Sequence, residues 1–414
     1  MAQSLDSSPA PAAPTRFERR KAEILHAAAG LFNRHGLRDA TLAVVASEIG
    51  LNLKSLRYYF ERKEDLVVAA FSRSIELHRG LIEEALAEPD FATRLRRFVS
   101  SYFALQARVR RKQEPPFIHF GDLRSLAQPQ LGIVGAAYVD LFRLTRALFR
   151  GPELAWSSDQ RSANAHLLIS QLLWSVVWID GYAPEDYPRV AERLSDILLH
   201  GIAAERIDLT EDVKAVPTPF EDGDRLSQES FLRAATQLIN QSGYRGASVE
   251  RISALLNVTK GAFYHHNETR DGLVVACFAR TFDIVRQAQD LAMAGAEDGL
   301  GRLTAATVSL VSRQMLPEGE LLRTSALTAI GPELRQEMLR RLQHSTLRFA
   351  DMLNDGLIDR SVRVCDMRIA SEAVTATINS AQELQRWVPG ATAENAAALY
   401  IRPLLHGLLA GPPA

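Results

Sequence analysis

The chain has 414 residues, of which 47% are hydrophobic and 23% charged, so it exceeds the usual size of one domain and cannot be largely disordered. A net charge of −1 and a pI near 6.8 exclude a uniformly basic protein, so DNA binding would need locally concentrated positive charge. Cys277 and Cys365 are too few for a disulfide scaffold. The stretch richest in apolar residues, 167–179, contains Gln171 and is too short to span a bilayer. We therefore expect a cytoplasmic protein without a membrane partner.

The N-terminal part of the chain predicts a flexible tail followed by a helix. Residues 1–14 are rich in Ser, Pro and Ala and form the expected tail. Thr15 and Glu18 then have the spacing of a capping box, and Gly36 is placed to end the helix in a left-handed conformation. The apolar stripe of this helix consists of Ile24, Ala27, Ala28, Leu31 and Phe32.

Two shorter helices are expected next. The first begins after Thr41, an N-cap residue, and Gly50 makes a tight turn at its end. Its inward-facing side chains are predicted to be Val44, Val45 and Ile49. Asn52 then caps a third helix that extends to Tyr59. A helix, a glycine turn and a short helix form the helix-turn-helix signature, in which the second helix enters the major groove of DNA.

The rest of the chain also predicts helices, because its apolar residues recur at spacings of three and four. Prolines and clustered acids without any period mark residues 210–225 as a linker. The predicted fold class is therefore all-α. The expected helices cover residues 93–111, 130–150, 160–181, 187–206, 298–314, 332–356, 366–386 and 392–409.

The sequence contains an internal repeat. Residues 24–71 align without a gap to residues 231–278, with 14 identical positions. Leu198-Leu199-His200-Gly201 recurs as Leu404-Leu405-His406-Gly407, so the repeat extends over whole units of about 200 residues. The predicted domains are 15–62 and 226–269 for the helix-turn-helix motifs, and 63–209 and 270–410 for the helical domains that follow them.

The repeated segments resemble a known family. The run 55–60, Ser-Leu-Arg-Tyr-Tyr-Phe, followed by Lys63-Glu64, is similar to the N-terminal signature of the TetR/AcrR transcriptional regulators, as is the run 259–266. The resemblance implies two TetR-like units, each with a three-helix DNA-binding domain and a helical domain that binds an effector and pairs through its last two long helices. Asn267 departs from the pattern where the first unit has Phe60, and this removes an anchor worth roughly 1.5–3 kcal/mol of burial.

The resemblance also suggests which residues contact a double-stranded DNA operator. In the first unit the expected contacts are Thr41, Lys54, Ser55, Arg57, Tyr58, Tyr59 and Lys63. In the second unit they are Ser248, Thr259, Lys260, Gly261, Ala262, Tyr264, His265, His266 and Arg270. Arg57 stands where the family usually has tyrosine, and Arg270 stands where the first unit has Lys63.

The two predicted recognition helices differ at nearly every exposed position, for example Arg57 against Tyr264. If the halves of one chain pair as an intrachain pseudo-dimer, the operator should therefore be asymmetric. If two chains form a homodimer by pairing like unit with like, a palindrome remains open.

Aromatic residues at helical spacing in the first unit suggest a pocket for a small hydrophobic effector. Its candidate residues are Phe117, His119, Phe120, Tyr138, Phe142, Gln171, Trp174 and Trp178. Each is equally well explained as a core residue of a helical bundle. The second unit offers Met315, Met338, Phe349, Met352, Asn379 and Trp387. No metal or cofactor is expected, because no cysteine or carboxylate cluster accompanies His265 and His266.

The function predicted from the sequence is repression released by an effector, with activation left open. The main alternative is a ligand-sensing or interaction module in which one or both helix-turn-helix motifs no longer bind DNA. An enzyme is not expected, because none of the common nucleotide-binding, hydrolase or metalloprotease motifs is present.

Overall fold

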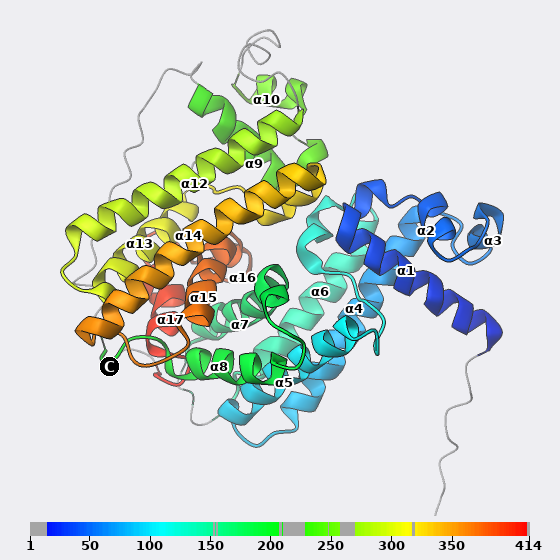
Figure 1. The fold of residues 1–414 in the computed structure, drawn as a ribbon. Helices are drawn as coiled ribbons and strands as arrows, with labels where there is room; N and C mark the ends of the chain where they lie inside the picture. Colours follow the sequence, from blue (N-terminus) through cyan, green and yellow to red (C-terminus); the bar gives the residue numbers. More distant parts are fainter. Residues whose placement is uncertain are drawn as a thin grey trace, which may run out of the picture. The chain divides into compact units, whose positions relative to one another are not determined.

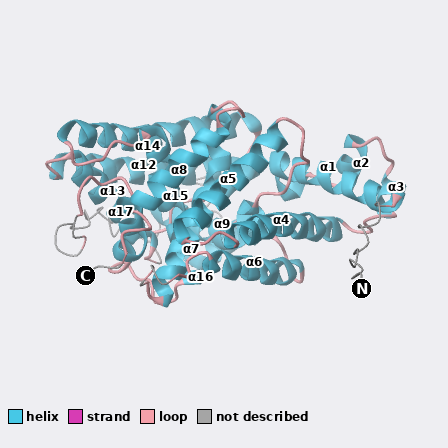
Figure 2. Ribbon diagram, turned by 90° about the horizontal axis from the view of Figure 1, so that it is seen from below, coloured by secondary structure: helices cyan, strands magenta, loops and turns pink. Residues whose placement is uncertain are grey.

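The computed structural model describes residues 15–151, 154, 156–206, 209, 228–246, 248–256, 270–316 and 319–411. Every regular element in these ranges is a helix (Figure 2). Within them, one isolated antiparallel bridge joins Ala203 to Val362. The all-α prediction is confirmed. The predicted tail 1–14 and linker 210–225 lie outside the described residues.

The chain divides into two compact units, and the boundary falls inside one helix. The first unit comprises the residues up to Ser74 together with Pro115–Ile118, and the second comprises Ile75–Glu114 and everything from His119 onward. The second unit therefore holds the helical domain of the first half and the described part of the whole second half. The domain limits drawn from the sequence remain predictions.

The first unit contains the predicted helix-turn-helix (Figure 1). Its helices are α1 (Arg16–Asp39), α2 (Leu42–Glu48), α3 (Leu53–Arg57) and the beginning of α4 (Lys63–Leu86). The capping box is present, since Thr15 N donates to Glu18 Oε2 at 2.7 Å and Glu18 N donates to Thr15 Oγ1 at 3.2 Å. Gly36 interrupts the helical backbone of α1 with φ of 72°. The core of this unit consists of Ile24, Leu31, Phe32, Val45, Leu56, Phe60, Leu66 and Phe71.

One inward-facing residue of α2 was predicted wrongly. Val44 is 41% exposed, and Ala46 is buried beside Val45 instead. The helix has only 7 residues, so only a narrow stripe of it can face the core, and Val44 falls outside that stripe.

The helical part of the first half forms a bundle in which α5 packs on α8 and α6 on α7. Its elements are α5 (Phe91–Arg110), η1 (Phe120–Ser125), α6 (Gln130–Ala147), α7 (Ser158–Trp178), η2 (Ile179–Gly181) and α8 (Tyr187–His200). The stretch Ser158–Gly181 is long and apolar enough to cross a membrane, but 72% of its most apolar window is buried, as in an internal bundle helix. The predicted helix 187–206 ends early, because Gly201 follows His200 with φ of 73°.

The second half repeats this arrangement. Its elements are α9 (Gln228–Gly246), α10 (Val249–Leu256), α12 (Arg270–Gly295), α13 (Gly299–Gln314), η3 (Thr324–Ala329), α14 (Pro332–Asp359), α15 (Met367–Ser380), η4 (Ala381–Glu383), α16 (Leu384–Trp387), η5 (Ala397–Ile401) and α17 (Arg402–His406). The predicted helix 392–409 is shorter at both ends. Gly407 ends α17 with φ of 80°, as Gly201 ends α8.

The last helices of the two halves pack against each other within the second unit. α7 contacts α15, and α8 contacts α15 and α17 (Figure 1). Where α8 and α17 end, Ala203 N donates to Leu405 O at 2.9 Å, and Leu409 N donates to Leu199 O at 3.1 Å. A shift of 206 in residue number converts each of these hydrogen bonds into the other. The two pairing faces are thus related by an approximate twofold axis, like the subunits of a dimer.

A contact between α7 and α15 obeys the same relation. Gln171 Nε2 donates to Thr377 Oγ1 at 3.1 Å, and these two residues are themselves 206 positions apart. Equivalent residues touch each other only close to a twofold axis, which places the axis beside Gln171. The structure therefore contains the intrachain pairing that the sequence left open.

Candidate DNA-binding site

Local hydrogen bonds fix both ends of the turn in the first helix-turn-helix. Thr41 Oγ1 accepts from Val44 N at 3.2 Å, and Asn52 Oδ1 accepts from Ser55 N at 2.8 Å. Between them Gly50 has φ of 63°, a left-handed conformation that favours glycine. The N-caps predicted for α2 and α3 are confirmed, and the Thr41 hydroxyl is occupied in part by its own helix.

The short helix α3 has one buried side chain and an exposed face. Leu56 is fully buried and anchors the helix, while Lys54 and Arg57 are exposed and Tyr58 is 75% exposed. Ser55 and Tyr59 are half-buried. The hydroxyl of Tyr58 and much of its ring are therefore in contact with water.

An aromatic cluster of Phe17, Tyr58 and Tyr59 joins α3 to the start of α1. Phe17 and Tyr59 stack with their ring centroids 4.9 Å apart, and Tyr58 meets Tyr59 edge-on at 5.3 Å. Phe17 was not among the site residues predicted from the sequence. Its position 7 residues before Ile24 puts it on the same helical stripe, and this register could have revealed it.

The charge on this part of the unit is locally positive. Residues 15–79 contain 12 Lys and Arg against 8 Asp and Glu. Several of the acids form ion pairs with arginines, such as Glu48 with Arg34 at 2.9 Å and Asp65 with Arg62 at 3.0 Å. Within the described part of the chain, Lys54 and Arg57 have no ion pair, so no acidic side chain neutralises their charges on α3.

Phe60, at the end of the motif, is a core residue. Its side chain is 4% exposed, and Lys21 Nζ lies 5.5 Å from the ring centroid. The ring therefore supports α1 as well as α3. The corresponding residue of the second half, Asn267, lies outside the described residues.

The second helix-turn-helix is described only in part. Ser248 Oγ accepts from Arg251 N at 3.3 Å and caps α10, as Thr41 caps α2, and Arg270 is the first residue of α12. The other predicted DNA contacts of this half lie outside the described residues: Thr259, Lys260, Gly261, Ala262, Tyr264, His265 and His266.

A clamp of three polar side chains holds the segment that follows α5 in the first unit. Asn33 Nδ2 donates to Phe117 O at 2.8 Å, and Arg73 Nη1 donates to Pro116 O at 2.9 Å. Ser74 Oγ accepts from Ile118 N at 2.9 Å. The clamp thus connects α1, the first helix of the helix-turn-helix, through Asn33 to residues 116–118 of the same unit.

The second half has the same clamp with the equivalent residues. Asn240 Nδ2 donates to Leu321 O at 2.9 Å and Arg280 Nη1 to Glu320 O at 3.3 Å, while Thr281 Oγ1 accepts from Leu322 N at 2.9 Å. None of the clamp side chains was predicted from the sequence as a functional residue. The identity of Asn33 and Asn240 within the repeat was the available signal, because an asparagine on an otherwise apolar stripe needs a hydrogen-bonding partner.

The structure brings together three of the predicted effector residues in an aromatic row. Phe120 and Tyr138 have ring centroids 5.2 Å apart, and Phe142 stacks on Trp387 at 3.7 Å. Trp387 also approaches Tyr138 at 6.0 Å. Because Trp387 belongs to the second half, the row unites candidates from both halves.

The remaining effector candidates lie elsewhere. Gln171 and Trp174 belong to the contact between the halves, where Trp174 Nε1 donates to Glu372 Oε2 at 3.0 Å. Trp178 packs against Phe103 and Tyr182. Phe117 is in the clamp of the first unit. His119 is near the aromatic row in sequence, and desolvation by burial, assisted by the neighbouring charges, lowers its pKa to about 4.

Comparison with known proteins identifies the same segments. The family model described as "Bacterial regulatory proteins, tetR family" matches residues 24–70 and again residues 231–277. The Transposon Tn10 TetC protein of Escherichia coli is 34% identical over 58 residues, which are 14% of this chain and 29% of that protein. The chain thus aligns with less than a third of the length of that relative.

Several solved structures resemble about half of the chain. The TetR family transcriptional regulator PfmR from Thermus thermophilus is 20% identical, with a TM-score of 0.36, and the match covers 43% of this chain and 98% of PfmR. The transcriptional regulator FadR from Bacillus subtilis in complex with stearoyl-CoA is 15% identical, with a TM-score of 0.36, and the match covers 44% of this chain and 100% of FadR.

Proposed function

Since the chain contains two domains of the tetR family of bacterial regulatory proteins, one in each half, we propose that it is a sequence-specific transcriptional regulator that binds DNA with α3. The observation that carries this proposal is the exposed face of α3, with Lys54, Arg57 and Tyr58 arranged around the buried Leu56. Arg57 would read a guanine edge or hold a phosphate, and Lys54 would hold a phosphate. Tyr59 and Lys63 are proposed phosphate contacts at the end of the motif.

In this proposal a single chain does the work of a dimer. The pairing faces of the two halves already contact each other, so two DNA-binding domains are joined without a second molecule. Because Arg57 and Tyr264 differ, as do their neighbours, the operator should consist of two unlike half-sites. The proposed site of action is the bacterial cytoplasm, and no catalytic step is part of the proposal.

Regulation would come from a small hydrophobic effector that reaches the aromatic row at Tyr138, Phe142 and Trp387. An apolar ligand that separates Phe142 from Trp387 would alter the contact between the halves. The clamps at Asn33 and Asn240 would pass such a change to the first helix of each DNA-binding domain. We propose that this releases DNA and ends repression. The effector can shift the equilibrium between the DNA-bound and the released conformation by no more than its difference in affinity for these two conformations.

The test combines the mass of the purified full chain in solution with binding to its own upstream DNA across a salt series. The proposal expects the mass of one chain, with affinity falling steeply as salt rises. Arg57→Ala should weaken specific binding by roughly 1–3 kcal/mol. Arg143→Ala, which removes a 73% exposed side chain on α6, is the control and should bind like wild type. Salt-insensitive binding, or equal affinities of the two variants, would refute the proposal.

A sensing module without DNA binding remains the second candidate for one half. Phe60 is buried and anchors the first motif, whereas the second half has Asn267 at that position. A second motif without this anchor would be less stable. Footprinting decides between the candidates, because two protected half-sites indicate two active motifs and one protected half-site indicates that only the first is active.

A further inference from the structure

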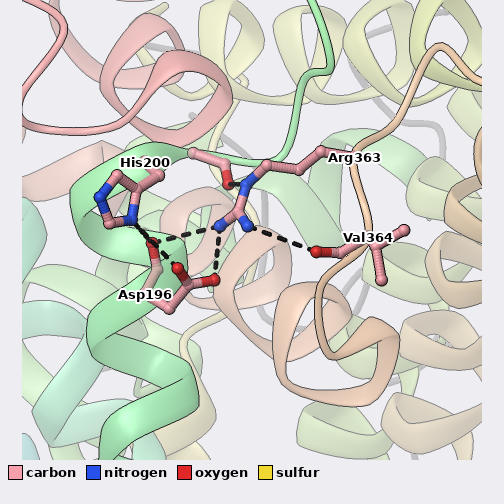
Figure 3. A network of polar contacts seen from close by, with 5 residues as sticks. Asp196, His200, Arg363 and Val364 are labelled. Carbon is pink, nitrogen blue, oxygen red and sulfur yellow. Dashed lines mark hydrogen bonds and ion pairs between the residues drawn. The ribbon is translucent and has the colours of Figure 1, made fainter.

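The approximate twofold axis allows the two sides of the pairing interface to be compared residue by residue. On one side, two ion pairs join α8 to the residues just before α15. Arg363 Nη2 donates to Asp196 Oδ2 at 2.7 Å, and Arg363 Nε donates to Gly201 O at 2.7 Å (Figure 3). Asp366 forms the second ion pair, with Arg193. Each half thus contributes one cation and one anion here, and each charge meets its opposite.

On the other side of the axis, the counterpart of the Arg193–Asp366 pair carries no charge. A shift of 206 converts Arg193 into Leu399 and Asp366 into Gln160. These two residues are also in contact, since Gln160 Nε2 donates to Leu399 O at 3.0 Å. The contact is therefore conserved by the symmetry, but a neutral amide and a backbone carbonyl replace the two charges.

A third contact, closer to the axis, differs between the sides in the same way. Trp174 Nε1 donates to Glu372 Oε2 at 3.0 Å. The equivalent residues, Ser380 and His166, are joined through a tyrosine, since Tyr400 OH lies 2.6 Å from Ser380 Oγ and 3.1 Å from His166 Nδ1. The carboxylate is again present on one side only.

A pairing of two second halves through these faces would bring unsuitable residues together. Arg363 would face Arg402, the equivalent of Asp196, and Asp366 would face Leu399, and each of these contacts would occur twice. Like charges that oppose each other across an interface are unfavourable. The Asp366 side chain is only 9% exposed, and removal of the cation from a buried ion pair is strongly destabilising.

A pairing of two first halves would lose both ion pairs without creating new ones. Asp196 would face Ser157, the equivalent of Arg363, and Arg193 would face Gln160. No like charges would meet, so this pairing is less unfavourable than that of two second halves. The ion pairs nevertheless form only when a first half meets a second half.

We propose that each pairing face selects the unlike half and rejects a copy of itself. The selection comes from the charges of the faces, in addition to the connection between the halves within one chain. Two whole chains would therefore not form a homodimer by pairing like half with like half. Selection of this kind does not require DNA, so it can fail while the proposed DNA binding stands.

Replacement of a residue by its equivalent from the other half tests this selection in the intact chain. Asp196→Arg gives the first half the residue type that the second half has at this position, so it reproduces one contact of two second halves. It should lower the midpoint of urea unfolding. Addition of Arg363→Asp restores opposite charges, and this double variant should recover at least half of the loss.

The second ion pair gives an independent test, which also serves if Asp196→Arg does not fold. Arg193→Leu again introduces the residue type of the second half, and it should lower the midpoint because Asp366 loses its cation. Asp366 Oδ1 accepts from Ile369 N at 3.1 Å, a hydrogen bond that the amide oxygen of Asp366→Asn can keep. Addition of Asp366→Asn to Arg193→Leu should therefore recover at least half of the loss.

Asp140→Arg is the matched control. It changes the net charge by the same amount as Asp196→Arg and breaks an ion pair with Arg143, at 2.8 Å, in which both side chains are exposed. It should lower the midpoint by less than half as much as Asp196→Arg. The proposal is overturned if the two charge reversals are equally costly, or if neither double variant is more stable than its parent single variant.

Discussion

Replacement of Gly201 or Gly407 by alanine should disrupt the contact between the two halves. Gly201 has φ and ψ of 73° and −165°, and Gly407 has 80° and 161°. A Cβ atom on Gly201 would come within 3 Å of Leu405 O, and one on Gly407 would come as close to Leu199 O. In each case the obstacle is backbone from the other half, which cannot move aside as the end of a flexible side chain can.

The cost of either substitution follows from two terms. Both backbone conformations lie in a region that is essentially restricted to glycine, and another residue there costs about 1–3 kcal/mol. The added methyl group also forces the crossing segments apart, which weakens the hydrogen bonds from Ala203 N and Leu409 N, at about 1 kcal/mol each. We therefore expect each single substitution to lower the free energy of unfolding by about 3–5 kcal/mol.

Urea unfolding followed by circular dichroism measures this loss. The double variant should lose less than the sum of the single losses, because the first methyl group has already separated the segments. Gly80→Ala is the control, since Gly80 lies within α4 and a Cβ atom there would have no other atom within 4 Å. The substitution should stabilise that helix by about 0.5–1 kcal/mol. If Gly201→Ala is as harmless as Gly80→Ala, the close crossing of the two halves does not exist.

Two further substitutions test the first motif and the pairing interface. Phe60→Asn should destabilise the first helix-turn-helix by about 3 kcal/mol. Tyr58→Asn, at a 75% exposed position, removes only the edge contacts of that ring with Phe17 and Tyr59 and should cost about 1 kcal/mol. Equal thermal shifts would contradict the assignment of Phe60 to the core. Burial raises the pKa of the Glu372 carboxyl from 4.5 to about 7. The folded state therefore holds the carboxyl proton more tightly than the unfolded chain does, and the free energy of unfolding should fall as pH rises from about 4.5 to 7. Glu372→Gln is the control, because its amide oxygen still accepts a hydrogen bond from Trp174. Over that pH range the free energy of unfolding of the wild type should fall by up to about 3 kcal/mol relative to this variant. Parallel pH profiles of the two proteins would show that the Glu372 carboxyl is not buried.

Features set by a few neighbouring residues could be predicted from the sequence. Thr15, Thr41 and Asn52 cap their helices as expected, because a side-chain cap needs only a hydroxyl or amide three residues before a backbone N–H. The internal repeat also predicted that the two halves of the chain have the same fold. The error at Val44 arose because apolar residues on both sides of a 7-residue helix do not show which side faces the core.

The predicted ends of α8 and α17, at residues 206 and 409, lie beyond the observed ends for a different reason. The apolar residues after Gly201 and after Gly407 continue the helical spacing, so each helix was extended through its glycine. In the structure these apolar residues cross the other half instead of forming another turn. Both glycines were visible as helix terminators, but the crossing that requires them depends on residues about 200 positions away.

Contacts between the halves could not be derived from spacing within one half. Phe142 and Trp387 were each recognised as pocket candidates, but nothing in the local pattern indicates that their rings stack. The clamp residue Asn33 was closer to prediction, since its identity with Asn240 was visible in the repeat. Its partner Phe117 O is a backbone atom, and a backbone partner leaves no residue type to recognise.

The crossing at Gly201 and Gly407 also determines how the pairing responds to dilution. Two separate subunits part when their concentration falls below their dissociation constant, and they exchange partners with related proteins. Two faces on one chain meet at an effective concentration set by the connection between them, which does not change with the number of molecules. The pairing described here should therefore persist at a few copies per cell, and it should exclude mixed dimers with separate proteins that carry similar pairing faces.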